Sequence, residues 1–107
     1  MTWLPSKTIK VKSRYGKIHI TLVEGNGRPP MVFIDAGKVG TGLQALVKGA
    51  QELINLALEK GATLEEVVQA VLPYKVRPEY ERDLWEAIAV GLCGGEKALL
   101  EKEVKHG

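Results

Sequence analysis

Residues 35–42 read Asp-Ala-Gly-Lys-Val-Gly-Thr-Gly, a glycine-rich stretch with a lysine and a threonine between apolar segments. A P-loop needs Gly-x-x-x-x-Gly-Lys-Ser/Thr, with its lysine directly before the helix that holds the phosphates. Here Lys38 precedes Gly42 by four residues, and no hydroxyl follows it directly. Two interpretations stay open: Thr41 caps the next helix at a turn, or that helix N-terminus and Lys38 bind an anion. An uncharacterised activity of Asp35, Lys38 and Thr41 is a further alternative.

Ligands for a metal or redox site are scarce. The chain has one cysteine, Cys93, and two histidines, His19 and His106. Zinc sites use four ligands, mostly Cys and His, at characteristic spacings, and a single thiol cannot form an internal disulfide. No pair of carboxylates stands out for acid–base catalysis. We therefore expect a protein that is not an enzyme and holds no metal or cofactor. We expect His19 at the surface and Cys93 as a small apolar residue at a helix end.

Basic residues gather before the first acid of the chain, Glu24: they are Lys7, Lys10, Lys12, Arg14 and Lys17. Residues 1–50 carry eight Lys and Arg against two acids, whereas residues 51–107 carry seven against eleven. Strict alternation over residues 8–14 places Lys10, Lys12 and Arg14 on one face of a strand. Such a face can neutralise phosphates, or it can be a solvated face that keeps the sheet monomeric. Both interpretations remain open.

The length of 107 residues fits one domain. No apolar run approaches the roughly 18 residues of a membrane helix, and residues 1–5 lack the pattern of a signal peptide. We therefore expect a cytoplasmic protein without a membrane partner. Few Asn, Gln, Met and Cys beside many Glu and Lys favour a heat-loving source.

Three strands are predicted before any helix. Residues 8–14 and 17–24 alternate, and residues 31–34 form a short third strand after two prolines. Residues 25–27, Gly-Asn-Gly, predict a tight hairpin between the second and third strands. Short turns between strands indicate an antiparallel meander.

Helical spacing begins at Leu43 and runs to Lys60, before Gly61 ends the helix. Because this helix is long and largely apolar, we expect it to be the central one, with its neighbours outside. Gly49 in its interior lowers helix propensity by about 1 kcal/mol. We expect close approach of another element there.

Further helices follow. Thr63 and Glu66 form a capping box for a short second helix that Pro73 ends. Pro78 suits the first turn of a third helix, whose early acids are Glu79, Glu81, Asp83 and Glu86. Gly94-Gly95 ends that helix, and residues 96–104 offer a fourth. Strands followed by helices predict an α+β fold with the helices on one face of the sheet. The single domain 1–107 would have a core at 8–72 and a helical tail at 78–105.

Several short motifs carry a resemblance to a known family. They are Gly-Lys-Ile-His-Ile-Thr at 16–21, Gly-Arg-Pro-Pro-Met-Val-Phe-Ile at 27–34, Gly-Lys-Val-Gly at 37–40, Leu-Ile-Asn-Leu-Ala-Leu-Glu-Lys-Gly at 53–61 and Leu-Glu-Glu-Val-Val at 64–68. In this order they resemble the TSCPD domain, which closes many cobalamin-dependent ribonucleotide reductases and also occurs as short free-standing proteins. The resemblance covers residues 8–72 well and the remainder loosely.

The family takes its name from a Thr-Ser-Cys-Pro-Asp motif, with another cysteine after the short helix. Here residues 91–95 read Gly-Leu-Cys-Gly-Gly, and residues 72–78 contain no thiol. The resemblance therefore implies that any metal or thiol chemistry of the relatives is lost in this chain. It carries no reductase activity over, because no reductase catalytic residue lies in this domain.

Two functional hypotheses follow. In the first, the protein is a non-catalytic accessory or regulatory partner in nucleotide or DNA metabolism. It would bind nucleic acid or nucleotide with Lys10, Lys12, Arg14, Lys17, Lys38 and Thr41, and a reductase subunit is one candidate partner. In the second, it is a protein–protein interaction module or inhibitor, cellular or viral. It would act through an open sheet edge or the helical tail, as a homodimer or with another protein, and Tyr80 and Trp85 would anchor the interface.

Overall fold

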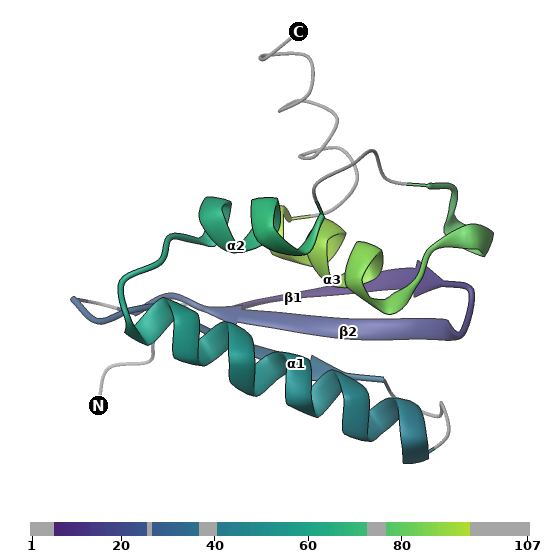
Figure 1. Ribbon diagram of the computed structural model, residues 1–107, viewed down its shortest axis with the longest axis horizontal. Coiled ribbons are helices and arrows are strands. Elements are labelled where there is room, and N and C mark those ends of the chain that lie inside the picture. Colours follow the sequence, from purple (N-terminus) through teal and green to yellow (C-terminus); the bar gives the residue numbers. More distant parts are fainter. Residues whose placement is uncertain (1–5, 26, 37–40, 73–76, 95–107) are drawn as a thin grey trace, which may run out of the picture.

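The computed structural model describes residues 6–25, 27–36, 41–72 and 77–94. One antiparallel sheet has the order β1-β2-β3, with β1 at Ser6–Ser13, β2 at Gly16–Val23 and β3 at Met31–Asp35. The helices follow it in the chain: α1 at Thr41–Glu59, α2 at Leu64–Val71, the 3₁₀ turn η1 at Glu79–Glu81, and α3 at Leu84–Leu92 (Figure 1). The predicted α+β fold is confirmed. The predicted fourth helix at 96–104 lies outside the described residues.

The strand register separates the sheet into two faces. Ile9 lies opposite Ile20, and Ile20 lies opposite Ile34, so apolar side chains line up across all three strands on one face. Ile20 and Ile34 are fully buried there.

The β1–β2 turn needs Gly16, whose φ of 123° is unfavourable for other residues. The tight turn predicted between β2 and β3 is present at its glycines, because Gly27 has a φ of 83° and the Arg28 N–H donates to the Gly25 carbonyl at 2.5 Å. Strand pairing resumes only at Val23 and Met31, since Pro29 and Pro30 lack the N–H of a ladder.

Helix α1 lies along the outer edge of β3 and seals it with side-chain amides. The Asn55 amide pairs with both backbone groups of Val32, at 2.7 Å for the N–H and 2.9 Å for the carbonyl. The Oε1 atom of Gln51 accepts from the Ile34 N–H at 2.9 Å, and that of Gln44 accepts from the Ala36 N–H at 3.0 Å. The sequence predicted the helix but not this role. Self-association through an open sheet edge was predicted, and the β3 edge of this sheet is already occupied.

The central helix is α3, and the expectation that the first helix occupies this place is wrong. Every residue from Glu86 to Leu92 is buried, as in a helix that neighbours surround. Gly91 permits this packing, because a Cβ atom at that position would collide with the side chain of Ile20. Helix α1, by contrast, buries one side and exposes Leu46, Leu53 and Leu56 on another.

Caps explain where the short helices begin. The predicted capping box of Thr63 and Glu66 is confirmed at the start of α2. The predicted helix start at Pro78 is wrong. Pro78 precedes only the turn η1, which contains Glu79 and Glu81, and α3 begins after a second capping box made by Asp83 and Glu86. The Asp83 carboxylate accepts the N–H of Glu86 at 2.8 Å, which fixes the start of the helix.

Candidate functional site

The face of the sheet away from the core is open in the described part of the chain. Its side chains are exposed or half-buried along all three strands. They are Thr8, Lys10 and Lys12 from β1, Lys17, His19 and Thr21 from β2, and Met31, Phe33 and Asp35 from β3. We call this set the open face.

Three neighbouring rows of cross-strand partners on the open face bring the lysines next to the rings of His19 and Phe33. Lys12 lies opposite Lys17 at the end near the β1–β2 turn. In the next row His19 lies between Lys10 and Asp35. In the third row the hydroxyls of Thr8 and Thr21 lie 2.9 Å apart, and Phe33 completes the row with 43% of its surface exposed. Directly opposed side chains on neighbouring strands have Cβ atoms about 5 Å apart, so these groups form one continuous surface.

Tyr80 joins the basic end of this surface from η1. A shallow cavity of about 300 Å³ is lined by Lys12, Ser13, Gly16, Lys17, Glu79 and Tyr80. Tyr80 is 76% exposed. The Lys12 ammonium lies 3.9 Å from the Glu79 carboxylate, and both side chains are at least half exposed. An exposed pair of this kind is weak and is broken readily by a competing anion.

Arg14 takes a different position from the lysines. Strand β1 ends at Ser13, so Arg14 lies in the turn, where its backbone N–H donates to the Arg82 carbonyl at 2.9 Å. Its guanidinium stacks over the Tyr15 ring, 5.6 Å from the centroid. The structure therefore brings Lys10, Lys12 and Lys17 together on the strands and places Arg14 beyond their end.

The glycine-rich stretch is only partly described. Lys38 lies outside the described residues, and of Thr41 only its position as the first residue of α1 is described. Asp35 is exposed, and its carboxylate accepts from the Gln44 amide at 3.2 Å. The hypotheses of an anion site or an activity at Asp35, Lys38 and Thr41 stay predictions.

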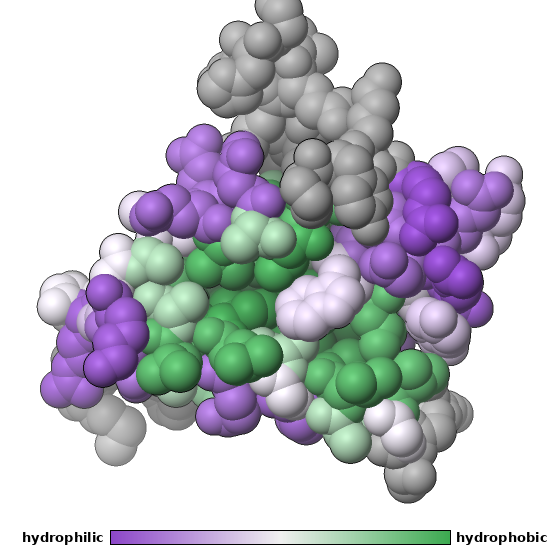
Figure 2. Space-filling model, in the orientation of Figure 1, coloured by the Kyte–Doolittle hydropathy of each residue, from purple (hydrophilic) through white to green (hydrophobic). Residues whose placement is uncertain are grey.

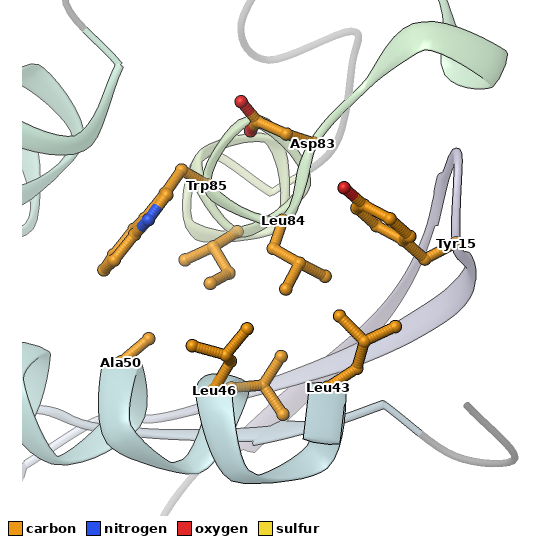
Figure 3. A pocket seen from close by; sticks show the side chains of 9 residues that line it. Tyr15, Leu43, Leu46, Ala50, Asp83, Leu84 and Trp85 are labelled. Carbon is orange, nitrogen blue, oxygen red and sulfur yellow. The ribbon is translucent and has the colours of Figure 1, made fainter. Parts of the chain in front are cut away.

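Trp85 lies on a separate surface, between α3 and α1. A groove of about 230 Å³ is lined by Tyr15, Leu43, Leu46, Val47, Ala50, Asp83, Leu84, Trp85 and Ile88. Figure 3 shows Trp85 and Leu84 reaching from α3 toward Leu46 and Ala50 on α1, while the Asp83 carboxylate points away from them. Trp85 is 42% exposed. The two aromatics predicted to share an interface thus line different cavities.

A buried carboxylate was missed by the sequence analysis. Glu86 is completely buried, and its carboxylate accepts from the Arg77 side chain at Nε, 2.9 Å, and at Nη2. It also accepts the backbone N–H groups of Arg77 at 2.9 Å and Asp83 at 3.1 Å. These bonds, above all those from the Arg77 side chain, lower the pKa of Glu86 from 4.5 to about 2 in spite of its burial, which acts to raise it. The Asp-x-x-Glu pattern at 83–86 was the available signal, because it is the pattern of a capping box.

Among the described residues, no three His, Cys, Asp or Glu side chains come together as a metal site would require. Cys93 is half-buried and follows the last residue of α3, where its N–H donates to the carbonyls of Ala89 and Gly91. No helix in the described ranges is long and apolar enough to span a membrane.

The family model described as the TSCPD domain matches residues 2–93. Neither the curated proteins nor the solved structures include a significant match to the chain. The match covers all the strands and helices described above.

Proposed function

Because the chain belongs to the TSCPD domain family, we propose that it is a non-catalytic accessory protein that holds single-stranded nucleic acid on its open face. The observation that carries this proposal is the strand register, which sets Lys10, Lys12 and Lys17 beside His19 and Phe33 on a sheet face that no described element covers. The resemblance to domains of ribonucleotide reductases supports a role in nucleotide or DNA metabolism.

The geometry favours a single strand over a duplex. Proteins that bind single strands combine lysines and arginines along the backbone with aromatic rings on which unpaired bases stack. Phe33 is exposed on the β3 side of the open face, and Tyr80 is exposed at its basic end. A duplex, in contrast, is read by a helix or ribbon inserted into a groove, whereas the helices here pack into the core on the other face.

The alternative of a protein–protein module rests on Tyr80 and Trp85. It is less well supported, because these residues line different cavities and the groove beside Trp85 is separate from the lysines. The apolar lining of that groove nevertheless suits an apolar side chain from a partner. This alternative predicts that Trp85→Ala abolishes capture of such a partner and leaves binding to oligonucleotides unchanged.

The lysines should set the salt dependence of binding. The logarithm of the association constant falls with the logarithm of salt concentration, with a slope of about −0.7 per phosphate neutralised on a single strand. Each of Lys10→Ala, Lys12→Ala and Lys17→Ala is therefore expected to reduce the magnitude of this slope by about 0.7. Fluorescence anisotropy with a labelled oligothymidylate at several salt concentrations measures it. Lys60→Ala, an exposed lysine after α1, is the matched control. Equal slopes for all four variants would refute the proposal.

Phe33 should supply affinity that does not depend on salt. A base stacked on an aromatic side chain contributes about 1–3 kcal/mol, so Phe33→Ala is expected to weaken binding by roughly 5- to 150-fold with the salt slope retained. The variant is expected to fold normally, because the side chain is half exposed and lies outside the core. An affinity equal to that of the wild type would remove the stacking part of the proposal.

A further inference from the structure

The two outer edges of the sheet differ in how their backbone groups are paired. Along β3, the edge that α1 follows, the outward N–H groups of Val32, Ile34 and Ala36 all donate to side-chain amides. These are alternate residues, because successive residues of a strand direct their backbone groups to opposite edges. Strand β1 forms the other edge of the sheet, and the same alternation decides which of its backbone groups point outward.

Two contacts with Arg82 identify the outward groups of β1. The Arg82 guanidinium donates to the Lys12 carbonyl at 3.4 Å, and the Arg82 carbonyl accepts the Arg14 N–H at 2.9 Å. Even-numbered residues of β1 therefore direct their backbone groups away from β2, and Thr8 and Lys10 are two of them. Within the described part of the chain, the backbone N–H and C=O groups of Thr8 and Lys10 have no hydrogen-bond partner. Arg82 thus closes one end of this edge, and the stretch over Thr8 and Lys10 is open.

A small hollow lies beside the same edge, on the side of the sheet that faces α3. Its volume is about 180 Å³, and it is lined by Ile9, Lys10, Val11, Lys12, Glu79, Arg82 and Val90. Ile9 and Val11 alternate with the lysines along β1 and belong to the core face. A strand laid along β1 would therefore place every second side chain beside Ile9 and this hollow, and the others beside the lysines of the open face.

Charge decides which strand can lie there. Strand β1 carries Lys7, Lys10 and Lys12 and no acid. A second copy paired through this edge would bring three lysines from each chain into two neighbouring strands, and lysines on an edge strand act against such pairing. A strand with acids at alternate positions is attracted instead, because opposite charges on neighbouring strands stabilise a sheet. This basic edge is separate from the apolar surface that Figure 2 shows over α1 and between α1 and α3.

We propose that the open edge of β1 binds an extended peptide of another protein as a further antiparallel strand. Acidic residues of the peptide face Lys10 and Lys12, and its apolar residues, which alternate with the acids, face Ile9. The backbone groups of Thr8 and Lys10 hold the peptide, and its alternate side chains give specificity, as in other cases of strand addition to a sheet edge. The proposal does not depend on binding of nucleic acid to the open face.

Hydrogen exchange of the backbone amides, followed by NMR, tests where the peptide binds. The probe is a peptide of alternating Glu and Val, added to the wild-type protein. The N–H groups of Thr8 and Lys10 should exchange rapidly in the free protein and slow by up to about 100-fold when the free peptide is at about 100 times its dissociation constant. Ile9 and Val11, whose N–H groups point to β2, should exchange slowly in both states. Absence of binding would overturn the proposal. So would binding without protection of Thr8 and Lys10, because the lysines would then attract the acids without strand pairing.

Thr8→Pro removes one of the outward N–H groups. Proline is tolerated on an edge strand where the N–H faces solvent, so the pairing of β1 with β2 should remain. The variant leaves a peptide carbonyl without its donor and is expected to weaken peptide binding by roughly tenfold or more in fluorescence anisotropy. Thr8→Ala is the matched control, because it also loses the hydroxyl contact with Thr21 but keeps the N–H. Equal affinities of the two variants would refute strand addition.

Modified peptides test the same geometry on the wild-type protein, without relying on the folding of a variant. Directly opposed residues of antiparallel strands lie on the same face and direct their backbone groups toward or away from each other together, so the Glu N–H groups should point to β1. Methylation of the Glu nitrogens should abolish binding, whereas methylation of the Val nitrogens should not. Equal binding of both methylated peptides would contradict the proposal. Thr8→Pro keeps every lysine of the open face, so its affinity for oligothymidylate should equal that of the wild type, and the two proposals can fail separately.

Discussion

Replacing Arg77 with methionine should lower the free energy of unfolding by about 3–5 kcal/mol at neutral pH, because it leaves a buried carboxylate without its cation. Glu86 is fully buried, and the Arg77 side chain supplies two of its hydrogen bonds. Only the backbone N–H groups of residue 77 and Asp83 would remain. The same carboxylate closes the capping box of α3, the central helix, so the loss acts on the core directly.

The pH dependence separates this explanation from a general packing defect. In the wild type the pKa of Glu86 is lowered from 4.5 to about 2, so the carboxylate stabilises the fold fully above its unfolded pKa. This contribution, about 3 kcal/mol, is lost as the pH falls from 4.5 toward 2. In Arg77→Met, burial without the cation should raise the pKa of Glu86 above its ordinary value. The free energy of unfolding should then increase as the pH is lowered below neutral, a slope opposite to that of the wild type.

Urea denaturation over a series of pH values measures both slopes. Arg28→Met, an exposed arginine in the loop before β3, is the matched control and should change stability by less than about 0.5 kcal/mol. Combining Arg77→Met with Glu86→Leu should recover much of the loss, because an apolar side chain carries no charge to bury. Parallel pH slopes for Arg77→Met and the wild type would show that Glu86 does not depend on Arg77.

The sequence predicted helix ends correctly where one or two neighbouring residues determine the backbone conformation. The capping box at Thr63 and the helix end at Gly61 depend only on neighbours in the chain, and both are confirmed. Which helix lies at the centre of the fold depends on tertiary packing, which periodicity cannot reveal. Leu53 and Leu58 fit the same helical pattern, yet the first is 63% exposed and the second 1%.

Polar residues with structural roles were the hardest to predict. Charged residues are rarely buried completely unless they are paired, so Glu86 was placed among the early acids of an exposed helix end, and Arg77 was not chosen at all. The amides of Gln51 and Asn55 gave no signal, because their partners are backbone groups of a strand 17 and 23 residues away.

The open face was predicted in part. Alternation along one strand was sufficient to place Lys10 and Lys12 on one side, and the register then adds Lys17 beside them. Phe33 was not chosen, because its place next to the lysines depends on the pairing of β2 with β3. Tyr80 was chosen for a different surface, since only the folded chain brings η1 near β1.

The hydrogen bonds from the Gln51 and Asn55 amides to β3 should contribute almost as much to the free energy of unfolding as the buried ion pair of Arg77 and Glu86. Gln51→Met with Asn55→Leu keeps the side-chain volumes similar but leaves three backbone groups, the N–H and carbonyl of Val32 and the N–H of Ile34, without their partners. Each such group costs about 1–3 kcal/mol when it is left unpaired away from water. We expect the free energy of unfolding to fall by about 3 kcal/mol in chemical denaturation, whereas Gln69→Leu on exposed α2 surface should change little.

The same variant should also change how the protein associates. An uncovered strand edge pairs readily with another strand, so the double variant is expected to form larger assemblies through β3. If the double variant kept the stability and the mass of the wild type, water would satisfy the β3 edge equally well. The amides of α1 would then have no part in keeping that edge closed.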